Sequence, residues 1–266
     1  MILYFGKCDL MILAVDVGNT CTTIGFFEND RLVNSVRMST DLSRTGDQYA
    51  ADLYNLIKIE GIGFDSFEGA VAASVVPAVN EALKFAVKKI LNLPLCIVGP
   101  GVKTGLNIKI DNPAQLGADL VVGGVAAVAK YPLPCIVFDM GTANTISVIN
   151  QKGEFLGGTI SAGMGISLDA LASKTAQLPY IDLENPEEVI GTNTVASMKS
   201  GLIYGTAAMM DGMADRIEEI LGQKATLVAT GGRAASVVKH CKRNFLLDCD
   251  LLLEGLNIIY KKNKGN

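Results

Sequence analysis

The stretch that decides the fold is Ile12-Leu-Ala-Val-Asp16-Val-Gly18-Asn-Thr-Cys-Thr-Thr23. Four apolar residues lead into Asp16, a turn with Gly18 follows, and strand-forming residues resume at Ile24–Phe27. An apolar run interrupted by a Gly/Asn turn predicts the first hairpin of a buried sheet. A carboxylate at the strand end, beside N–H groups that Gly18 leaves accessible, suits a phosphate and its cation. Asp-x-Gly-Asn also makes ordinary hairpins, so this turn alone does not decide the function.

A second copy of the same pattern strengthens the phosphate-binding interpretation. Sliding the chain by 123 residues without a gap places Asp16 on Asp139, Gly18 on Gly141 and Thr22 on Thr145. Apolar strands flank both copies, and self-similarity of this kind indicates a duplicated structural unit. The sequence therefore predicts an α/β protein whose two similar halves each carry an Asp-bearing turn, with both turns facing one cleft.

Composition limits the class of protein. The chain has 266 residues, 49% of them hydrophobic, with 28 glycines and no tryptophan, which is typical of a tightly packed α/β enzyme. A net charge of −4 gives no basic surface for nucleic acid, and no apolar run approaches the length of a membrane span. The six cysteines lack C-x-x-C spacing, which favours reduced thiols. We expect a cytoplasmic protein without nucleic-acid or membrane partners.

The order of expected elements gives the domain plan. Residues 1–10 look like an extension, and Met11 is a possible true start; the first domain is expected over 11–112 and the second over 113–266. In the first domain the pattern predicts the order β-β-β-α-β-α-β. In the second, Asn112 and Pro113 predict a helix that runs to about Lys130. A long helix is expected over Val195–Leu221, with inward residues Met198, Leu202, Met209, Met213, Ile217 and Ile220.

Three further stretches carry possible chemistry. Asp119 lies among small and apolar residues, where a carboxylate is costly unless it is paired or functional; the alternative is that it faces solvent. Gly99-Pro-Gly-Val-Lys-Thr-Gly105 lacks P-loop spacing and is either a domain connection or a ligand-gripping loop. Gly163-Met-Gly165 opens a helix whose N-terminus could bind an anion, and Gly231-Gly232 could admit a flat ligand where a strand meets a helix.

Taken together, these motifs resemble the type III pantothenate kinases of the acetate-and-sugar-kinase, Hsp70 and actin superfamily. The resemblance covers nearly all of 11–263. It rests on an ordered set of motifs that is specific only as a set: Asp16-Val-Gly-Asn-Thr20, Ala73-Ser-Val-Val-Pro77, Gly99-Pro-Gly-Val-Lys-Thr-Gly-Leu106, Asp111-Asn-Pro113, Gly117-Ala-Asp119, Asp139-Met-Gly-Thr-Ala143, Asn193-Thr194, Ala229-Thr-Gly-Gly232 and Leu253-Glu-Gly-Leu256.

The resemblance implies two ribonuclease-H-like (actin-like ATPase) halves with ATP between them, a homodimer, and phosphorylation of pantothenate in coenzyme A biosynthesis. It implies Mg²⁺ and a monovalent cation, K⁺ or NH₄⁺, as cofactors, with Asp139 holding the monovalent ion. Asp119 would be the base on the substrate hydroxyl. The residues implied to contact ATP are Asp16, Val17, Gly18, Asn19, Thr20, Cys21, Thr22, Thr23, Thr142, Gly231 and Gly232; those implied to border pantothenate are Ile110, Gly117, Ala118, Asp119, Leu120 and Thr194.

Departures from the family pattern concentrate on the acceptor side. The family usually has Arg at the position of Leu120 and Tyr at that of Ile110, and an acidic residue is common at that of Ser147. Two alternatives therefore stand beside pantothenate kinase. One is a paralogue with a different hydroxyl acceptor or none, and the other is a regulatory protein that uses ATP binding as a switch. Asp119 favours an enzyme, because a switch needs no base there.

Overall fold

The computed structural model describes residues 10–264, so all but Leu10 of the predicted extension lies outside the described residues. Two compact units make up this part of the chain. The first comprises 10–105, Ala114–Ala126 and 252–264, and the second comprises Leu106–Pro113 and Ala127–Leu251. This division differs from the continuous domains 11–112 and 113–266 predicted above, because 114–126 and the last helix belong to the first unit and 106–113 to the second.

The first unit is built on a five-stranded sheet of order β3-β2-β1-β4-β5. Its strands are β1 (Met11–Val17), β2 (Cys21–Glu28), β3 (Arg31–Ser39), β4 (Phe67–Ser74) and β5 (Leu95–Ile97). The helices are α1 (Gly46–Ile59), the 3₁₀ turn η1 (Phe64–Ser66), α2 (Pro77–Leu91) and α7 (Leu251–Asn263). Thr45 and Gln48 form a capping box at the start of α1, and Pro77 stands in the first turn of α2.

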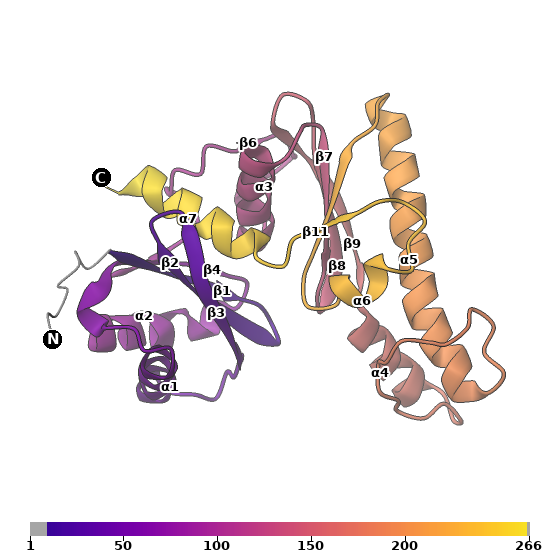
Figure 1. The fold of residues 1–266 in the computed structure, drawn as a ribbon, viewed down its shortest axis with the longest axis horizontal. Helices are drawn as coiled ribbons and strands as arrows, with labels where there is room; N and C mark the ends of the chain where they lie inside the picture. The colour runs from indigo at the N-terminus through magenta and orange to yellow at the C-terminus, as the bar shows by residue number, and fades with distance from the viewer. Residues whose placement is uncertain (1–9, 265–266) are drawn as a thin grey trace, which may run out of the picture. The chain divides into compact units, whose positions relative to one another are not determined.

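Alternation along β1 separates the two faces of this sheet. Leu13, Val15 and Val17 enter the core with α1 and α2, so Ile12, Ala14 and Asp16 point to the opposite face. Figure 1 shows α1 and α2 on one side of the sheet and α7 on the other. Asp16 therefore lies at the strand end on the face that the α1–α2 pair does not cover.

The second unit repeats the strand order with one strand added. Its sheet runs β11-β10-β7-β8-β9-β6, in which the first five strands reproduce the antiparallel and parallel neighbours of the first sheet. The strands are β6 (Asn107–Ile108), β7 (Cys135–Met140), β8 (Ala143–Ile149), β9 (Glu154–Ala162), β10 (Thr226–Thr230) and β11 (Leu246–Leu247). The helices are η2 (Pro113–Gln115), α4 (Met164–Lys174), α5 (Thr194–Leu221) and α6 (Ala234–Val238), while α3 (Ala118–Lys130) is shared between the units.

The duplication is confirmed, but its gapless alignment is wrong by one residue after the turn. Asp16 pairs with Thr23 across the first hairpin, whereas Asp139 pairs with Thr145 across the second. The second turn is thus one residue shorter, and the structural equivalent of Thr145 is Thr23, not Thr22. A turn can lose a residue without moving the strands that flank it, which a gapless comparison cannot detect.

Two helix predictions need correction. Pro113 starts only η2, and α3 begins at Ala118, after Gly117, whose carbonyl accepts the first helical hydrogen bond from Val121 N. In α5, Met210 is fully buried, whereas Ile220 is 85% exposed. Ile217 and Leu221 keep the inward face to the end of the helix, and Ile220 lies outside that face. Among residues 10–264, no helix combines the length and apolar character needed to cross a membrane.

Candidate functional site

The first Asp-bearing turn is a tight, braced loop at the end of β1. Gly18 N donates to the carbonyl of Cys21 at 3.0 Å and closes the turn. The hydroxyl of Thr40 donates to the carbonyl of Gly18 at 2.8 Å and lies 2.8 Å from the hydroxyl of Thr22. The tip residues Asn19, Thr20 and Cys21 are exposed, so the turn presents a fixed backbone to solvent. Thr40 was not predicted, because it stands after the third strand, and a lone Thr at a strand end is no signal in sequence.

The second turn has the same closure and gains a helix. Gly141 N donates to the carbonyl of Ala143 at 3.2 Å, and Gly163 N donates to the carbonyl of Thr142 at 3.1 Å. A side chain at Gly163 would overlap the carbonyl oxygens of both Gly141 and Thr142. Gly163 is the residue before α4, so the start of that helix lies directly against the turn. Turn amides and a helix N-terminus together favour an anion.

Gly231 lies against the carboxylate of Asp139. Its φ of +91° favours glycine, and a Cβ there would overlap Asp139 Oδ1 and the backbone of Met140. Arg233 N donates to the carbonyl of Met140 at 3.0 Å, which holds the glycine loop on β7. The second unit therefore brings together the predicted cation ligand and the predicted adenosine loop, which are 92 residues apart in sequence.

Asp119 lies in the first turn of α3 and is half-buried. Its Oδ1 accepts a hydrogen bond from Leu120 N at 2.9 Å, and a side chain at Gly117 would collide with this oxygen. Burial raises the pKa of the Asp119 carboxyl above its ordinary value, while the hydrogen bonds from the Leu120 and Asp119 backbone N–H groups oppose that shift. None of the groups that shift this pKa is a cation. A half-buried carboxyl whose pKa is raised in this way is a good candidate for proton transfer.

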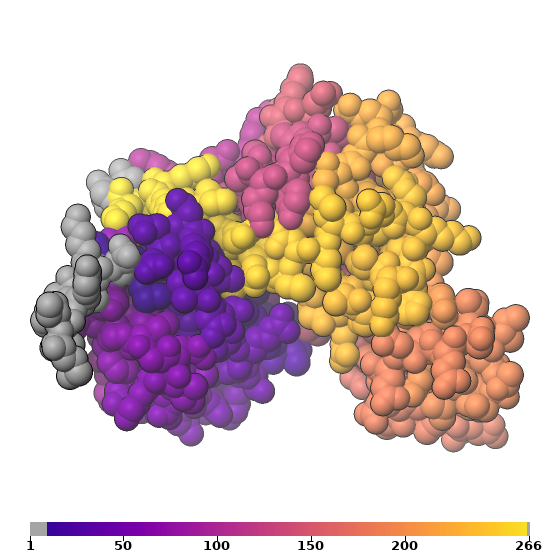
Figure 2. Space-filling view, in the orientation of Figure 1, coloured from indigo at the N-terminus to yellow at the C-terminus, as the bar shows by residue number. Residues whose placement is uncertain are grey.

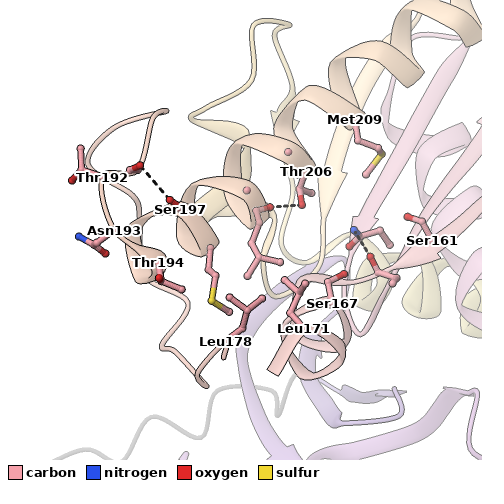
Figure 3. A pocket seen from close by; sticks show the side chains of 17 residues that line it. Ser161, Ser167, Leu171, Leu178, Thr192, Asn193, Thr194, Ser197, Thr206 and Met209 are labelled. Carbon is pink, nitrogen blue, oxygen red and sulfur yellow. Dashed lines mark hydrogen bonds between the residues drawn. The ribbon is translucent and has the colours of Figure 1, made fainter. Parts of the chain in front are cut away.

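A cavity of about 800 Å³ lies in the second unit between α4, the segment before α5, and α5 itself (Figure 3). Thr194, predicted to border the acceptor, stands at its rim with Thr192 and Asn193, and Asn193 caps α5 by accepting from Ala196 N at 2.9 Å. Hydroxyl groups from Ser161, Ser167 and other residues face apolar ones, and the lining holds no charged residue. The lining consists of Asn144, Ser161, Ala162, Ser167, Leu171, Leu178, Gly191–Thr194, Ser197, Met198, Gly201, Leu202, Gly205, Thr206 and Met209.

The two residues that depart from the family pattern on the acceptor side, Leu120 and Ile110, lie in apolar or half-buried positions. Leu120 follows Asp119 in α3 and is half-buried. Ile110, in the second unit, points a methyl group toward Gly157, within 3.7 Å of the position a Cβ on that glycine would occupy. Lys109 Nζ lies 3.7 Å from Glu154 Oε1, so this lysine already has a carboxylate partner. Neither apolar residue can supply the polar contact that the family has at its position.

The structure thus groups the predicted residues by unit. The first unit holds 16–23 and 117–120, and the second holds Ile110, Asp139, Thr142, Thr194 and 231–232. Within the second unit, Asp139, Thr142 and Gly231 gather around one turn, while Thr194 lies at the cavity.

Comparison with known proteins gives the family. A family model described as type III pantothenate kinase matches residues 12–216. A type III pantothenate kinase of Syntrophotalea carbinolica is 40% identical over 255 residues, which is 96% of this chain and 100% of the relative. Another, of Exiguobacterium sp., is 42% identical over 254 residues, with 96% and 100% covered.

Solved structures agree on the fold alone. A ROK hexokinase of Thermus thermophilus superposes with a TM-score of 0.51 at 12% identity, covering 97% of this chain and 100% of that one. Component A of (R)-2-hydroxyglutaryl-CoA dehydratase from Acidaminococcus fermentans gives 0.52 at 14% identity, covering 95% and 98%. The predicted fold class, an α/β protein of actin-like ATPase type built by duplication, is confirmed.

The family match spans most of the chain, the relatives are matched over their whole length, and both Asp-bearing turns are present in repeated sheets. The chain belongs to the type III pantothenate kinase family.

Proposed function

We propose that this protein transfers the γ-phosphoryl group of ATP to the hydroxyl of pantothenate, giving 4′-phosphopantothenate, the first step of coenzyme A biosynthesis. Family membership supports an ATP-using kinase that acts on a small molecule. The observation that carries the proposal is Asp119, a half-buried carboxyl with a raised pKa at the start of α3. A cytoplasmic location, where ATP is available, remains the prediction.

The proposed roles follow the physics of phosphoryl transfer, in which positioning and charge neutralisation matter more than covalent help. Residues 16–23 and Thr142 hold the phosphates through backbone N–H groups and hydroxyls. Gly231 and Gly232 lie at the adenosine. Asp119 orients the acceptor hydroxyl and accepts its proton late in the transfer. Ile110, Gly117–Leu120 and Thr194 border pantothenate.

The cation proposal rests on the glycine beside Asp139. Because Gly231 has no side chain, its backbone approaches Asp139 Oδ1 closely, where a Cβ would overlap that oxygen and the carbonyl oxygen of Met140. One carboxylate with backbone carbonyls suits a weakly held monovalent cation, K⁺ or NH₄⁺. Mg²⁺ would arrive with ATP, since it is usually bound through substrate phosphates and one or two carboxylates. Both cations would neutralise charge on the phosphates.

A homodimer is the proposed assembly, and exposed apolar residues support it. Ile160 is 75% exposed, Tyr180 68% and Ile190 81%, and each is close in sequence to a residue that lines the α4–α5 cavity. If these exposed apolar side chains form one patch, they fit an interaction surface between two copies of the chain. Sedimentation velocity checks this proposal: we expect a dimer at micromolar concentration, and a monomer there would contradict it.

Turnover with and without acceptor tests the proposed reaction. We expect ADP release that depends on pantothenate and is faster in potassium than in sodium buffer, because the acceptor hydroxyl must be present for transfer and the Asp139 site favours K⁺ or NH₄⁺. The measurement is ADP production at saturating Mg-ATP. ATP binding without any turnover would favour the regulatory alternative, and turnover only with another hydroxyl compound would favour the paralogue.

The acceptor-side departures predict weak pantothenate binding. A bidentate Arg–carboxylate pair contributes about 1.5–3 kcal/mol and a Tyr hydroxyl about 0.5–1.5 kcal/mol, and neither Leu120 nor Ile110 can supply them. The double variant Ile110→Tyr, Leu120→Arg should lower the KM for pantothenate roughly thirty- to a thousand-fold while the KM for ATP stays unchanged. Steady-state kinetics with each substrate varied in turn measures this. A low-micromolar pantothenate KM in the unmodified protein would show that other residues supply the lost contacts.

A further inference from the structure

Two motifs singled out in the sequence have no role in the proposed reaction: Leu253-Glu-Gly-Leu256 and the glycine-rich loop Gly99–Gly105. The first is part of α7, and the residues that contact the loop are also in α7. This helix returns to the first unit after the chain has completed the second. What α7 contacts there therefore indicates why both motifs are present.

The base of α7 is fixed on the first sheet. Leu253, Leu256 and Ile259 are buried, and a Cβ at Gly25 of β2 would lie 2.9 Å from Leu253 Cδ1. Tyr260 crosses Gly69 of β4, and its hydroxyl donates to the carbonyl of Glu68 at 3.2 Å. In the space-filling view the C-terminal residues (yellow) lie directly against the N-terminal strands (indigo) (Figure 2). The contacts with β2 and β4 thus fix the position of α7 on the sheet.

Gly255 brings α7 into backbone contact with α3. A Cβ at this position would overlap the carbonyl oxygen of Val122 and would lie 2.8 Å from Val122 Cγ1. Val122 is fully buried and stands three residues, about one helical turn, after Asp119. Asp119 stands at the start of α3. The distance between α7 and α3, which the Gly255–Val122 contact sets, therefore determines where the Asp119 carboxyl lies.

The other end of α7 holds the glycine-rich loop. Lys103 N donates to Asn263 Oδ1 at 3.0 Å, Asn263 Nδ2 donates to the carbonyl of Lys103 at 2.9 Å, and Lys262 Nζ donates to the carbonyl of Thr104 at 3.0 Å. Gly105 has a φ of +76° and lies under Lys262, where a side chain would collide with Nζ. The chain passes into the second unit immediately after Gly105, toward Ile110. These bonds favour the connecting role for the loop over the ligand-gripping one.

We propose that α7 is a positioning element for the acceptor side of the kinase, acting on Asp119 through the Gly255–Val122 contact and on the 99–105 connection through Asn263. This inference rests on the proposed function for its readout. Gly255 and Asn263 are not among the residues proposed to contact ATP or pantothenate, so we assign them a positioning role. The contacts explain why both motifs belong to one pattern although they are about 150 residues apart.

The test compares two glycine-to-alanine changes on facing helices. Gly255→Ala forces α7 and α3 apart by on the order of 1 Å, a displacement that can cost up to about 10²-fold at an active site. Gly123→Ala is the matched control, because a Cβ at Gly123 of α3 meets no atom within 4 Å. We expect Gly255→Ala to lose about 10- to 100-fold in kcat with its ATP Kd unchanged, and Gly123→Ala to keep the kcat of the unmodified protein.

Two more variants separate positioning from stability. Leu83→Ala removes a buried side chain of α2 and should lower the Tm without lowering kcat at a temperature where the protein is folded. Asn263→Ala retains α7 and should raise the pantothenate KM several-fold more than the ATP KM. Wild-type kinetics in both Gly255→Ala and Asn263→Ala would overturn the proposal, as would a kcat loss in Leu83→Ala equal to that of Gly255→Ala at the same Tm.

The activity of the unmodified protein distinguishes the proposed kinase function from the proposed positioning role of α7. Absence of pantothenate phosphorylation there contradicts the proposed function. Phosphorylation that is present and insensitive to both α7 variants contradicts the positioning role alone. If Gly255→Ala does not fold, Asn263→Ala decides: an unchanged pantothenate KM overturns the proposal.

Discussion

Replacing Asp119 by Asn is expected to lower kcat by about 10²–10⁴-fold while ATP binding survives. The amide keeps the shape of the carboxyl and can still accept from Leu120 N, which lies 2.9 Å from Asp119 Oδ1. It cannot accept the proton of the acceptor hydroxyl. Rapid-quench measurement of a single turnover, beside an ATP titration, separates the two steps. A variant that lost ATP affinity instead would place Asp119 at the nucleotide and contradict its role as base.

The pH dependence of the unmodified protein provides an independent check on Asp119. The carboxyl must be ionised to act as base, and burial raises its pKa, so kcat/KM for the acceptor should fall as the pH drops through that raised value. The residual rate of the Asn variant should lack this acid limb. An identical acid limb in both proteins would assign it to another group.

The same shift predicts the effect on stability. A carboxyl whose pKa is raised in the folded state is more ionised in the unfolded chain, so the free energy of unfolding falls as pH rises from its ordinary pKa of 3.8 through the raised folded value. Above the raised folded value the full penalty is present, and Asp119→Asn removes it. We therefore expect a Tm equal to or above that of the unmodified protein, and a large drop would mean that Asp119 stabilises the fold.

The second large effect is expected at the two turns. Asp16→Asn and Asp139→Asn should each lower kcat/KM for ATP on the order of 10²-fold or more, because each removes a negative charge that we propose serves the bound phosphates or their cations. Both residues stand at the ends of their strands, and both side chains are only half-buried, so the folds should survive. Steady-state kinetics with circular dichroism measures both properties.

A matched carboxylate controls for general charge effects at the turns. Asp65 is exposed in η1, away from either turn in sequence, and Asp65→Asn should leave kcat/KM for ATP unchanged. Near-normal turnover in Asp139→Asn would mean that the second turn is a relic of the duplication. Loss of turnover in all three variants alike would indicate a general electrostatic effect and not two sites.

Local patterns made much of the fold predictable. The hairpin beginning at Ile12 opens with a continuous apolar run that leads into a glycine turn, so both copies could be found from the sequence. The start of α1 could also be predicted from local sequence, because Thr45 and Gln48, three residues apart, form a capping box there. Boundaries set by nearby side chains and turns can be found without the rest of the protein.

Tertiary contacts decided what the sequence could not. Asn112 and Pro113 favour a helix start, yet α3 begins at Ala118, where Gly117 accepts the first helical bond. Ile220 fits the apolar period of α5 and is nonetheless exposed, because Ile217 and Leu221 occupy the face that packs on the core. The return of α7 to the first unit depends on partners such as Val122 and Gly25, which lie 133 and 228 residues before Gly255 and Leu253 in the sequence.

In the candidate site too, some residues could be predicted from local sequence and others only from tertiary contacts. Asp16, Asp119 and Asp139 could be chosen from their sequence surroundings, because each is a carboxylate in an apolar or glycine-rich setting. The hydrogen bond from Thr40 to Gly18 and the close approach of Gly231 to Asp139 join segments that are not neighbours in the sequence. No local pattern distinguishes these residues from ordinary ones.

Direct identification of the product tests the central claim most directly. The purified protein is incubated with Mg-ATP and pantothenate in potassium buffer, and the product is followed by ³¹P NMR, with Asp119→Asn beside it. We predict a phosphomonoester signal at the 4′ position of pantothenate that grows with ADP in the unmodified protein and is nearly absent in the variant. ADP formation without that phosphomonoester, or an equal yield from Asp119→Asn, would contradict the account.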